Sequence, residues 1–366
     1  MQKSNVLLLR VALLTALLAY AVVLLGAYTR LSDAGLGCPD WPGCYGQLLA
    51  PSHAPEIDAA AAAYPESRVE PAKAWKEMIH RYAAGTLGLL IVLLAVLSFR
   101  GRRRGSWRRW LAGFLVVLVI FQALLGMWTV TLQLKPVVVM GHLLGGLALL
   151  ASLWWLVLRE QQRWKPVSGP AALLRRLRPR AWIALALVTL QIVLGGWTSA
   201  NYAALACPDF PTCQGLWWPN VDFLDGFTPW RGLGVNYEGG VLNLAAATAV
   251  HMAHRLGALI VLLYVGWLAL HLMRERAGLH LIRQDERAQR AGLHLIRQDE
   301  RAQRAGLHLC RYGLAMLVAL LAQVALGVMN VLMLLPLPVA VAHNGVAVLL
   351  LLSVVTLLHA LHPPRA

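Results

Sequence analysis

The stretch Glu77-Met78-Ile79-His80-Arg81 leads directly into an apolar run, YAAGTLGLLIVLLAVLSF, at residues 82–99. An apolar run of about 20 residues is long enough to cross a bilayer as a helix. Residues three apart share one helix face, so Glu77 and His80 face one space at the mouth of the run. The stretch predicts a membrane-spanning helix with a carboxylate and an imidazole at one end.

Comparable apolar runs recur along the 366 residues, of which 58% are hydrophobic. The mean hydropathy of +0.59 is well above that of soluble domains. The first run continues into Tyr28-Thr29-Arg30 without an Ala-x-Ala cleavage pattern, so we interpret it as a span, not a cleaved signal. We expect an all-α integral membrane protein with eight transmembrane helices. They are expected near residues 7–28, 82–99, 110–131, 138–158, 181–200, 246–271, 312–334 and 339–361.

The net charge of +16 is concentrated in short segments between apolar runs. Segment 100–109 holds six arginines and no acid, whereas loops 29–79 and 201–245 together hold five basic and eleven acidic residues. Because basic loops stay on the cytoplasmic side, both termini are expected in the cytoplasm. This clustering, without a nucleic-acid-binding signature, argues against nucleic acid as a partner.

Four of the five cysteines form two pairs in the expected outward loops, Cys38 with Cys44 and Cys207 with Cys213. Disulfides persist on that side of the membrane, and two local bridges would stabilise the loops. A redox role stays open, because an exposed disulfide exchanges with thiols. Cys310 stands alone on the reducing side.

The two halves of the chain repeat each other. The loop LGCPDWPGC at residues 36–44 returns as LACPDFPTC at residues 205–213. Each odd-numbered span ends with Leu-Gly-x-x-Thr or Leu-Gly-x-x-Asn, with glycines at positions 26, 126, 195 and 327. An even number of spans per half makes the repeat parallel. We expect two four-helix bundles, residues 1–165 and 166–366.

A cytoplasmic loop at residues 276–309 contains a second, shorter repeat. Residues 276–289 recur unchanged as residues 290–303. Two copies are too few for a solenoid, which indicates a tandem duplication in a solvated, partly helical loop, with a docking segment as the alternative. Its histidines, His280, His294 and His308, are products of the copying.

One histidine lies near the outer end of each even-numbered span: His80, His142, His254 and His343. An ionisable group in an apolar helix indicates function. Two histidines on neighbouring helices can supply both axial ligands of one haem iron. Pairing within each half gives His80 with His142 and His254 with His343. Zinc needs three or four converging ligands, so two bis-histidine haem sites fit this pattern better.

Arg81 and Arg255 directly follow two of these histidines. Their planar guanidinium groups suit haem propionates, although arginines at a membrane rim also extend toward water. Glycines surround the histidines as well, which suits either a planar macrocycle or close helix packing. They are Gly85, Gly88, Gly145, Gly146, Gly257 and Gly345.

The halves differ three residues before the ligand, where Glu77 in the first half is replaced by His251 in the second. This difference suggests acid–base chemistry in the first half and electron transfer in the second. The alternative for Glu77 is an exposed residue near a helix N-terminus, where negative charge is favourable.

These residues together resemble the haem A synthase family, specifically its disulfide-bearing bacterial branch. The resemblance covers nearly the whole chain and rests on the eight spans, the paired cysteine loops and the following motifs: Glu77-x-x-His80-Arg81, His142 after Met140-Gly141, His251-x-x-His254-Arg255, and His343. The duplicated segment and Cys310 depart from the family pattern.

The resemblance implies oxidation of the C8 methyl group of haem O to a formyl group, which gives haem A for terminal oxidases. The first half, with His80, His142 and Glu77 as catalytic residue, would take haem O as substrate. The second half, with His254 and His343, would hold a permanent haem B.

The resemblance also places the chain in the bacterial cytoplasmic (inner) membrane, with the cysteine loops on the extracytoplasmic side. Membrane lipid, haem O synthase, an unidentified electron donor and a second copy of the chain are the expected partners. Two rival functions remain from the sequence: a dihaem electron carrier that makes no new haem, and a haem-delivery factor.

Overall fold

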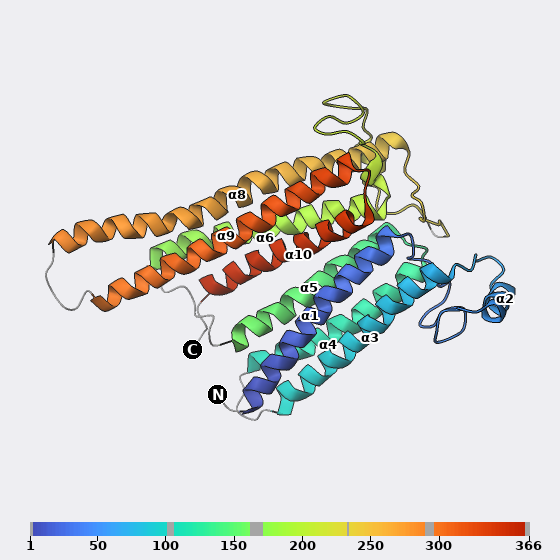
Figure 1. Ribbon diagram of the computed structural model, residues 1–366, viewed down its shortest axis with the longest axis horizontal. Coiled ribbons are helices and arrows are strands. Elements are labelled where there is room, and N and C mark those ends of the chain that lie inside the picture. The colour runs from blue at the N-terminus through green and yellow to red at the C-terminus, as the bar shows by residue number, and fades with distance from the viewer. Residues whose placement is uncertain (1–2, 101–105, 162–170, 233, 290–295, 363–366) are drawn as a thin grey trace. The chain divides into compact units, whose positions relative to one another are not determined.

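The computed structural model describes residues 3–100, 106–161, 171–232, 234–289 and 296–362, with side chains of residues 3–5, 171–172, 275–289 and 296–306 outside the description. The described chain is all-helical (Figure 1). Eight of its helices are long and apolar enough to cross a membrane, which confirms the expected number of candidate spans within this part of the chain. The protein is therefore a multi-pass membrane protein.

The eight long helices fall where the apolar runs predict them. They are α1 (Lys3–Leu31), α3 (Pro71–Arg100), α4 (Ser106–Thr131), α5 (Pro136–Glu160), α6 (Ala171–Ala200), α8 (Leu244–Gln289), α9 (Ile296–Leu332) and α10 (Leu337–Leu361). Three short helices lie in the two long loops: α2 (Ala54–Ala63), the 3-10 turn η1 (Ala203–Leu205) and α7 (Phe223–Gly226).

Helix α3 begins at Pro71, well before the apolar run that predicts it. Proline is favourable in the first helical turn, where no helical hydrogen bond needs its missing N–H. The polar residues up to Arg81 are therefore helical too. As a result, Glu77 and His80 lie inside the helix instead of at its end.

The residues group into two compact units. The first unit contains residues 1–157, 193–254 and 326–345, and the second contains residues 158–192, 255–325 and 346–366. Within the first unit, α1 packs against α3 and α3 against α4, and Figure 1 shows these helices side by side. The expected division of the chain at residue 165 follows the sequence repeat and stays a prediction.

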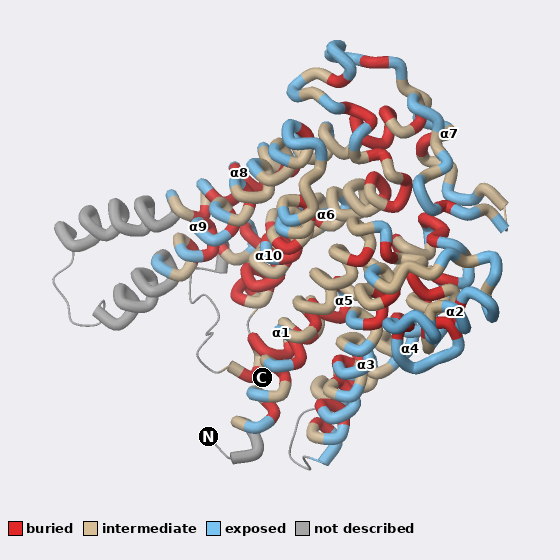
Figure 2. The backbone as a smooth tube through the Cα atoms, turned by 45° about the vertical axis from the view of Figure 1, so that its right-hand side comes forward, coloured by how far each residue is buried: buried red, intermediate tan, exposed pale blue. Residues whose placement is uncertain are grey.

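Both cysteine loops close through the same local structure. Cys38 is bonded to Cys44 and Cys207 to Cys213, which confirms both predicted disulfides. In each loop the second cysteine and the residue three positions later exchange backbone hydrogen bonds of 2.8 to 3.1 Å. Figure 2 shows that much of the first loop around α2 is exposed, although its disulfide is buried.

An aspartate caps each of these loops. The carboxylate of Asp40 accepts hydrogen bonds from the N–H groups of Tyr45 and Gly46, at 2.6 and 2.8 Å. Asp209 accepts from Gln214 and Gly215, at 2.5 and 3.0 Å. A hydrogen bond from the Thr212 hydroxyl, together with these N–H groups, lowers the pKa of Asp209. Both loops are therefore built from one design.

The end of α6 and the long loop that follows it contact the ends of the first helices. Arg30 at the end of α1 donates to the carbonyl of Ser199 at 2.5 Å, and its guanidinium lies 3.9 Å from the ring centre of Tyr202. Lys135 is only 2% exposed and donates to the carbonyl of Gly232 at 2.9 Å. These contacts tie the loop to α1 and to the α4–α5 turn within the first unit.

Candidate functional site

All four candidate ligand histidines lie in the first compact unit. Each is inside a long helix, with His80 on α3, His142 on α5, His254 on α8 and His343 on α10. Each histidine lies six to ten residues from the first residue of its helix, or roughly 9–15 Å along the axis. His80 and His142 are close enough to interact electrostatically, as the predicted pair requires.

Each histidine ring lies with its Cε1 atom against a glycine of another helix. A Cβ atom built on Gly26 would lie 3.0 Å from Cε1 of His80, and one on Gly126 would lie 3.4 Å from Cε1 of His142. The corresponding distances are 2.9 Å from Gly195 to His254 and 3.1 Å from Gly327 to His343. The four glycines of the Leu-Gly-x-x-Thr/Asn pattern are thus contact residues of the histidines.

The ring orientations fit coordination of a haem iron. Nδ1 of His80, His142 and His343 is enclosed by protein atoms, although each residue keeps partial exposure. The ring of His80 lies at the backbone of Val22 and that of His142 at the backbone of Gln122. For these two residues Nε2 is the nitrogen left to bind a metal.

No group of three or more His, Cys, Asp or Glu side chains among the described residues is arranged to hold a metal ion. Zinc sites in proteins need such a converging group. The described side chains therefore give no support to the zinc alternative.

The glycines that surround the histidines serve different purposes. A Cβ atom on Gly85 or Gly88 would meet nothing within 4 Å, so close helix packing does not explain these two. Gly145 does pack closely, because its Cβ would overlap the side chain of Gln122. Gly345 packs against Leu24 and the hydroxyl of Tyr20.

Glu77 is a buried carboxylate with 5% exposure, so the alternative of an exposed helix-terminal residue is wrong. Its Oε1 accepts a hydrogen bond from Nη2 of Arg81 at 2.5 Å, and its Oε2 accepts from the backbone N–H of Cys38 at 2.9 Å. The carboxylate therefore links the histidine-bearing helix to the first disulfide loop.

Arg81 is the second link between α3 and that loop. Its Nη1 donates to the carbonyl of Asp40 at 2.9 Å and also contacts the carbonyls of Pro42 and Gly43. These contacts use both terminal nitrogens of the guanidinium. Sequence reasoning missed this role, because nothing in the loop sequence marks three carbonyl groups as acceptors.

In the second half the residue one turn before the ligand is His251, which is 4% exposed. It lies on α8, three residues before His254. The position is therefore buried in both halves, but only the first half has a carboxylate there. Arg255 follows His254 and is half-buried.

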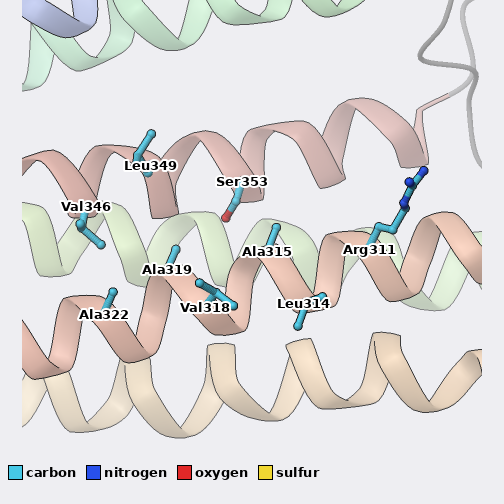
Figure 3. Close-up of a pocket in the computed structure, with 9 residues that line it drawn as sticks. All are labelled: Arg311, Leu314, Ala315, Val318, Ala319, Ala322, Val346, Leu349 and Ser353. Atoms are coloured by element: carbon cyan, nitrogen blue, oxygen red, sulfur yellow. The ribbon is translucent and has the colours of Figure 1, made fainter.

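A groove of about 540 Å³ lies between α9 and α10 in the second unit (Figure 3). Its lining is mostly aliphatic, with Arg311 at one end and Ser353 on α10. None of the four histidines lines it. The groove is therefore separate from the candidate ligands.

Comparison with known proteins identifies the family of the chain. Residues 9–298 and 291–355 match the family described as Cytochrome oxidase assembly protein, COX15-CtaA. The two matched ranges overlap at residues 291–298, inside the duplicated segment, as expected if one copy is an insertion.

Two of three similar proteins match the chain over more than nine tenths of its length. The chain is 43% identical over 350 residues to the Heme A synthase of Shewanella oneidensis, covering 96% of this chain and 94% of that protein. It is 27% identical to the Heme A synthase of a Bradyrhizobium strain, covering 94% and 88%. With the Heme A synthase of Shouchella clausii it shares 29% identity over 58% of this chain. The chain therefore belongs to the cytochrome oxidase assembly protein family COX15-CtaA.

Proposed function

We propose that this protein is a haem A synthase, an oxidoreductase that converts the C8 methyl group of haem O to a formyl group. Family membership and the relatives named Heme A synthase support this activity. The structural observation that carries it is Glu77, a buried carboxylate one helical turn from a candidate haem ligand. A simple electron carrier has no need for such a carboxylate.

His80 and His142 hold the substrate haem O, and His254 and His343 hold a permanent haem B. The resident haem supplies electron transfer when bound. The enclosed Nδ1 of three of these rings supports the assignment, because it directs the opposite nitrogen away from the helices. Arg81 and Arg255 remain candidates for the propionates, with Arg81 also serving Glu77.

Glu77 acts next to the methyl group as a proton acceptor or as a negative charge that stabilises developing positive charge. Hydrogen bonds from Arg81 and Cys38 fix both of its oxygens. A carboxylate held in this way is oriented before the substrate binds, which lowers the cost of reorganisation. Each oxygen keeps a second lone pair, so Glu77 can take up a proton while both hydrogen bonds remain.

The chain lies in the bacterial cytoplasmic membrane with its basic loops and both termini inside and its cysteine loops outside. Residues 1–165 and 166–366 form the substrate half and the cofactor half, related by a parallel repeat. The matching hydrogen bonds of the two cysteine loops and the four matching glycine–histidine contacts support this repeat. A haem O synthase supplies the substrate, and an unidentified partner serves as electron donor.

The test compares Glu77→Gln with Glu66→Gln, which changes an exposed glutamate in the loop just before α3. Both variants are purified from cells that make haem O, and their haems are extracted and separated by chromatography. We expect Glu77→Gln to retain bound haem but to lose haem A, while Glu66→Gln matches the wild type. Full haem A production by Glu77→Gln would exclude the assigned role.

The same extraction separates the synthase from the dihaem electron carrier. A synthase contains haem O or haem A in addition to haem B when haem O is available. Haem B alone, with and without a haem O source, would favour the carrier.

A further inference from the structure

We propose that Gly26, Gly126, Gly195 and Gly327 are positioning residues that set the orientation of the four imidazole rings. The inference rests on the proposed haem ligation and goes beyond it. It assigns a role to glycines that bind neither haem nor substrate. Each glycine lets the backbone of one helix come close to the ring of a ligand on another.

The distances from a Cβ atom built on each glycine to the nearest histidine ring show how tight these contacts are. A real Cβ atom almost never lies within 3.0 Å of another heavy atom, and Gly195 would place one 2.9 Å from Cε1 of His254. Gly26 and Gly327 would place theirs at 3.0 and 3.1 Å. Gly126, at 3.4 Å from His142, is the most tolerant of the four. Alanine is therefore expected to move the ring at three of these positions.

The four glycines occupy the same position relative to the ends of their helices. Each lies five residues before the last residue of its helix, where the helices end at Leu31, Thr131, Ala200 and Leu332. The contact is also specific to one ring atom, since Cε1 is the nearest atom in all four cases. Because all four contacts involve the same ring atom and the same position in the helix, we interpret them as one repeated way of orienting a histidine ring.

The backbone one helical turn before the glycine also lies against the ring in the first half of the chain. The ring of His80 lies at the backbone of Val22, four residues before Gly26, and that of His142 lies at Gln122, four residues before Gly126. Nδ1 of both rings is enclosed by protein atoms, which limits how each ring can turn. A side chain at the glycine would push the ring away from this backbone. The glycine therefore controls both the position and the plane of the ligand.

The plane of the ring matters because the angle between two axial imidazoles determines the spectrum of a ferric low-spin haem. Axial ligation and its hydrogen bonds also tune the reduction potential. The test therefore uses Gly195→Ala and Gly327→Ala in the half that holds the permanent haem. Two controls carry the same change where a Cβ has room: Gly113, with nothing within 4 Å, and Gly266, with one contact at 3.6 Å.

Full-length wild type and variants are purified with haem bound, checked for helicity by circular dichroism, and measured by electron paramagnetic resonance and redox titration. We expect the largest g value and the midpoint potential to shift in Gly195→Ala and Gly327→Ala, by at least about twice any change in the controls. Loss of haem from a variant that remains helical counts as the same result, because it means that the ligand has been displaced. Gly26→Ala and Gly126→Ala extend the series, and Gly126→Ala should have the smallest effect.

The outcomes separate this inference from the proposed function. A wild type without a bis-histidine low-spin signal would contradict the proposed haem ligation itself. A wild type with that signal, and with Gly195→Ala and Gly327→Ala indistinguishable from the controls, would overturn only the positioning role. If one of the two variants unfolds, the other still tests the positioning role, because Gly195 contacts His254 and Gly327 contacts His343.

Discussion

Glu77 and Arg81 form a buried ion pair whose two members also hold the first disulfide loop. Their side chains are 6% and 12% exposed, and Arg81 Nη2 lies 2.5 Å from Glu77 Oε1. An ion pair at this depth gains little over an apolar pair, but removing one partner leaves a charge without compensation. Removing one partner is therefore expected to destabilise the protein by more than the net contribution of the intact pair to the free energy of unfolding.

Replacing Arg81 by glutamine should destabilise the protein by about 3 kcal/mol, because Glu77 stays buried and several loop carbonyls lose a donor. Thermal unfolding of the purified variant, followed by circular dichroism, measures the change. Arg68→Gln is the matched control, since Arg68 lies in the same loop with an exposed side chain. Equal unfolding midpoints for the two variants would contradict the role of Arg81.

At the scale of elements, the two cysteine loops have the same internal structure but different attachments. The first packs on α3 through a buried cluster that includes Cys38, Ala74 and Met78, and it donates the Cys38 N–H to Glu77. The second packs against Met252 on α8. The first loop is therefore attached to the proposed catalytic carboxylate. The second loop has no such attachment to Glu77 among the described contacts and serves as the control.

Removing each disulfide separately tests this difference. By the loop-entropy relation, each ring, with a separation of six residues, contributes about 2.4 kcal/mol. We expect the double variants Cys38→Ser/Cys44→Ser and Cys207→Ser/Cys213→Ser to lose similar stability. Haem A formed per bound haem should fall only in the first variant, because only there does Glu77 lose its partner. An equal fall in both would show that the attachment to Glu77 has no special effect.

Hydropathy and motif spacing predict the number and approximate bounds of the helices, because both signals are local. The glycine pattern is also visible in the sequence, but its partners are not, since the contact between Gly26 and His80 depends on how two helices pack. The start of α3 at Pro71 was missed because polar residues continue the helix beyond the apolar run. Hydropathy and motif spacing therefore predict the helices, whereas the contacts between helices depend on packing that the sequence does not reveal.

At the scale of the whole molecule, contacts between residues far apart in sequence fix the helix ends within the first unit. The backbone N–H of Tyr237 donates to the carbonyl of Gln133 at 3.1 Å, beside the Lys135 contact. Arg30 reaches Ser199 across 169 residues of sequence. No periodicity or composition predicts such pairs, because each depends on a loop returning to a distant helix end.

One copy of the duplicated segment at residues 276–303 is expected to be dispensable. Deleting residues 276–289 leaves an identical copy in the same place, so haem content and haem A production should stay within about twofold of the wild type. The matched control deletes the same number of residues, 54–67, from the loop between α1 and α3. That deletion removes Ala60 and Tyr64 from the cluster around the first disulfide and should abolish activity. A strong loss from the deletion of residues 276–289 would indicate a function for the second copy.

The fixed distance from each glycine to its helix end has a consequence for how this chain tolerates insertions. An extra residue in an exposed part of the long loop between Leu31 and Pro71 is expected to leave the glycines and histidines facing each other. One extra residue inside α1 on the membrane side of Gly26 would instead turn that glycine by about 100° relative to the rest of the helix. Single-residue insertions should therefore be tolerated in exposed parts of the long loop and should disturb the ligand geometry when they fall inside the spans.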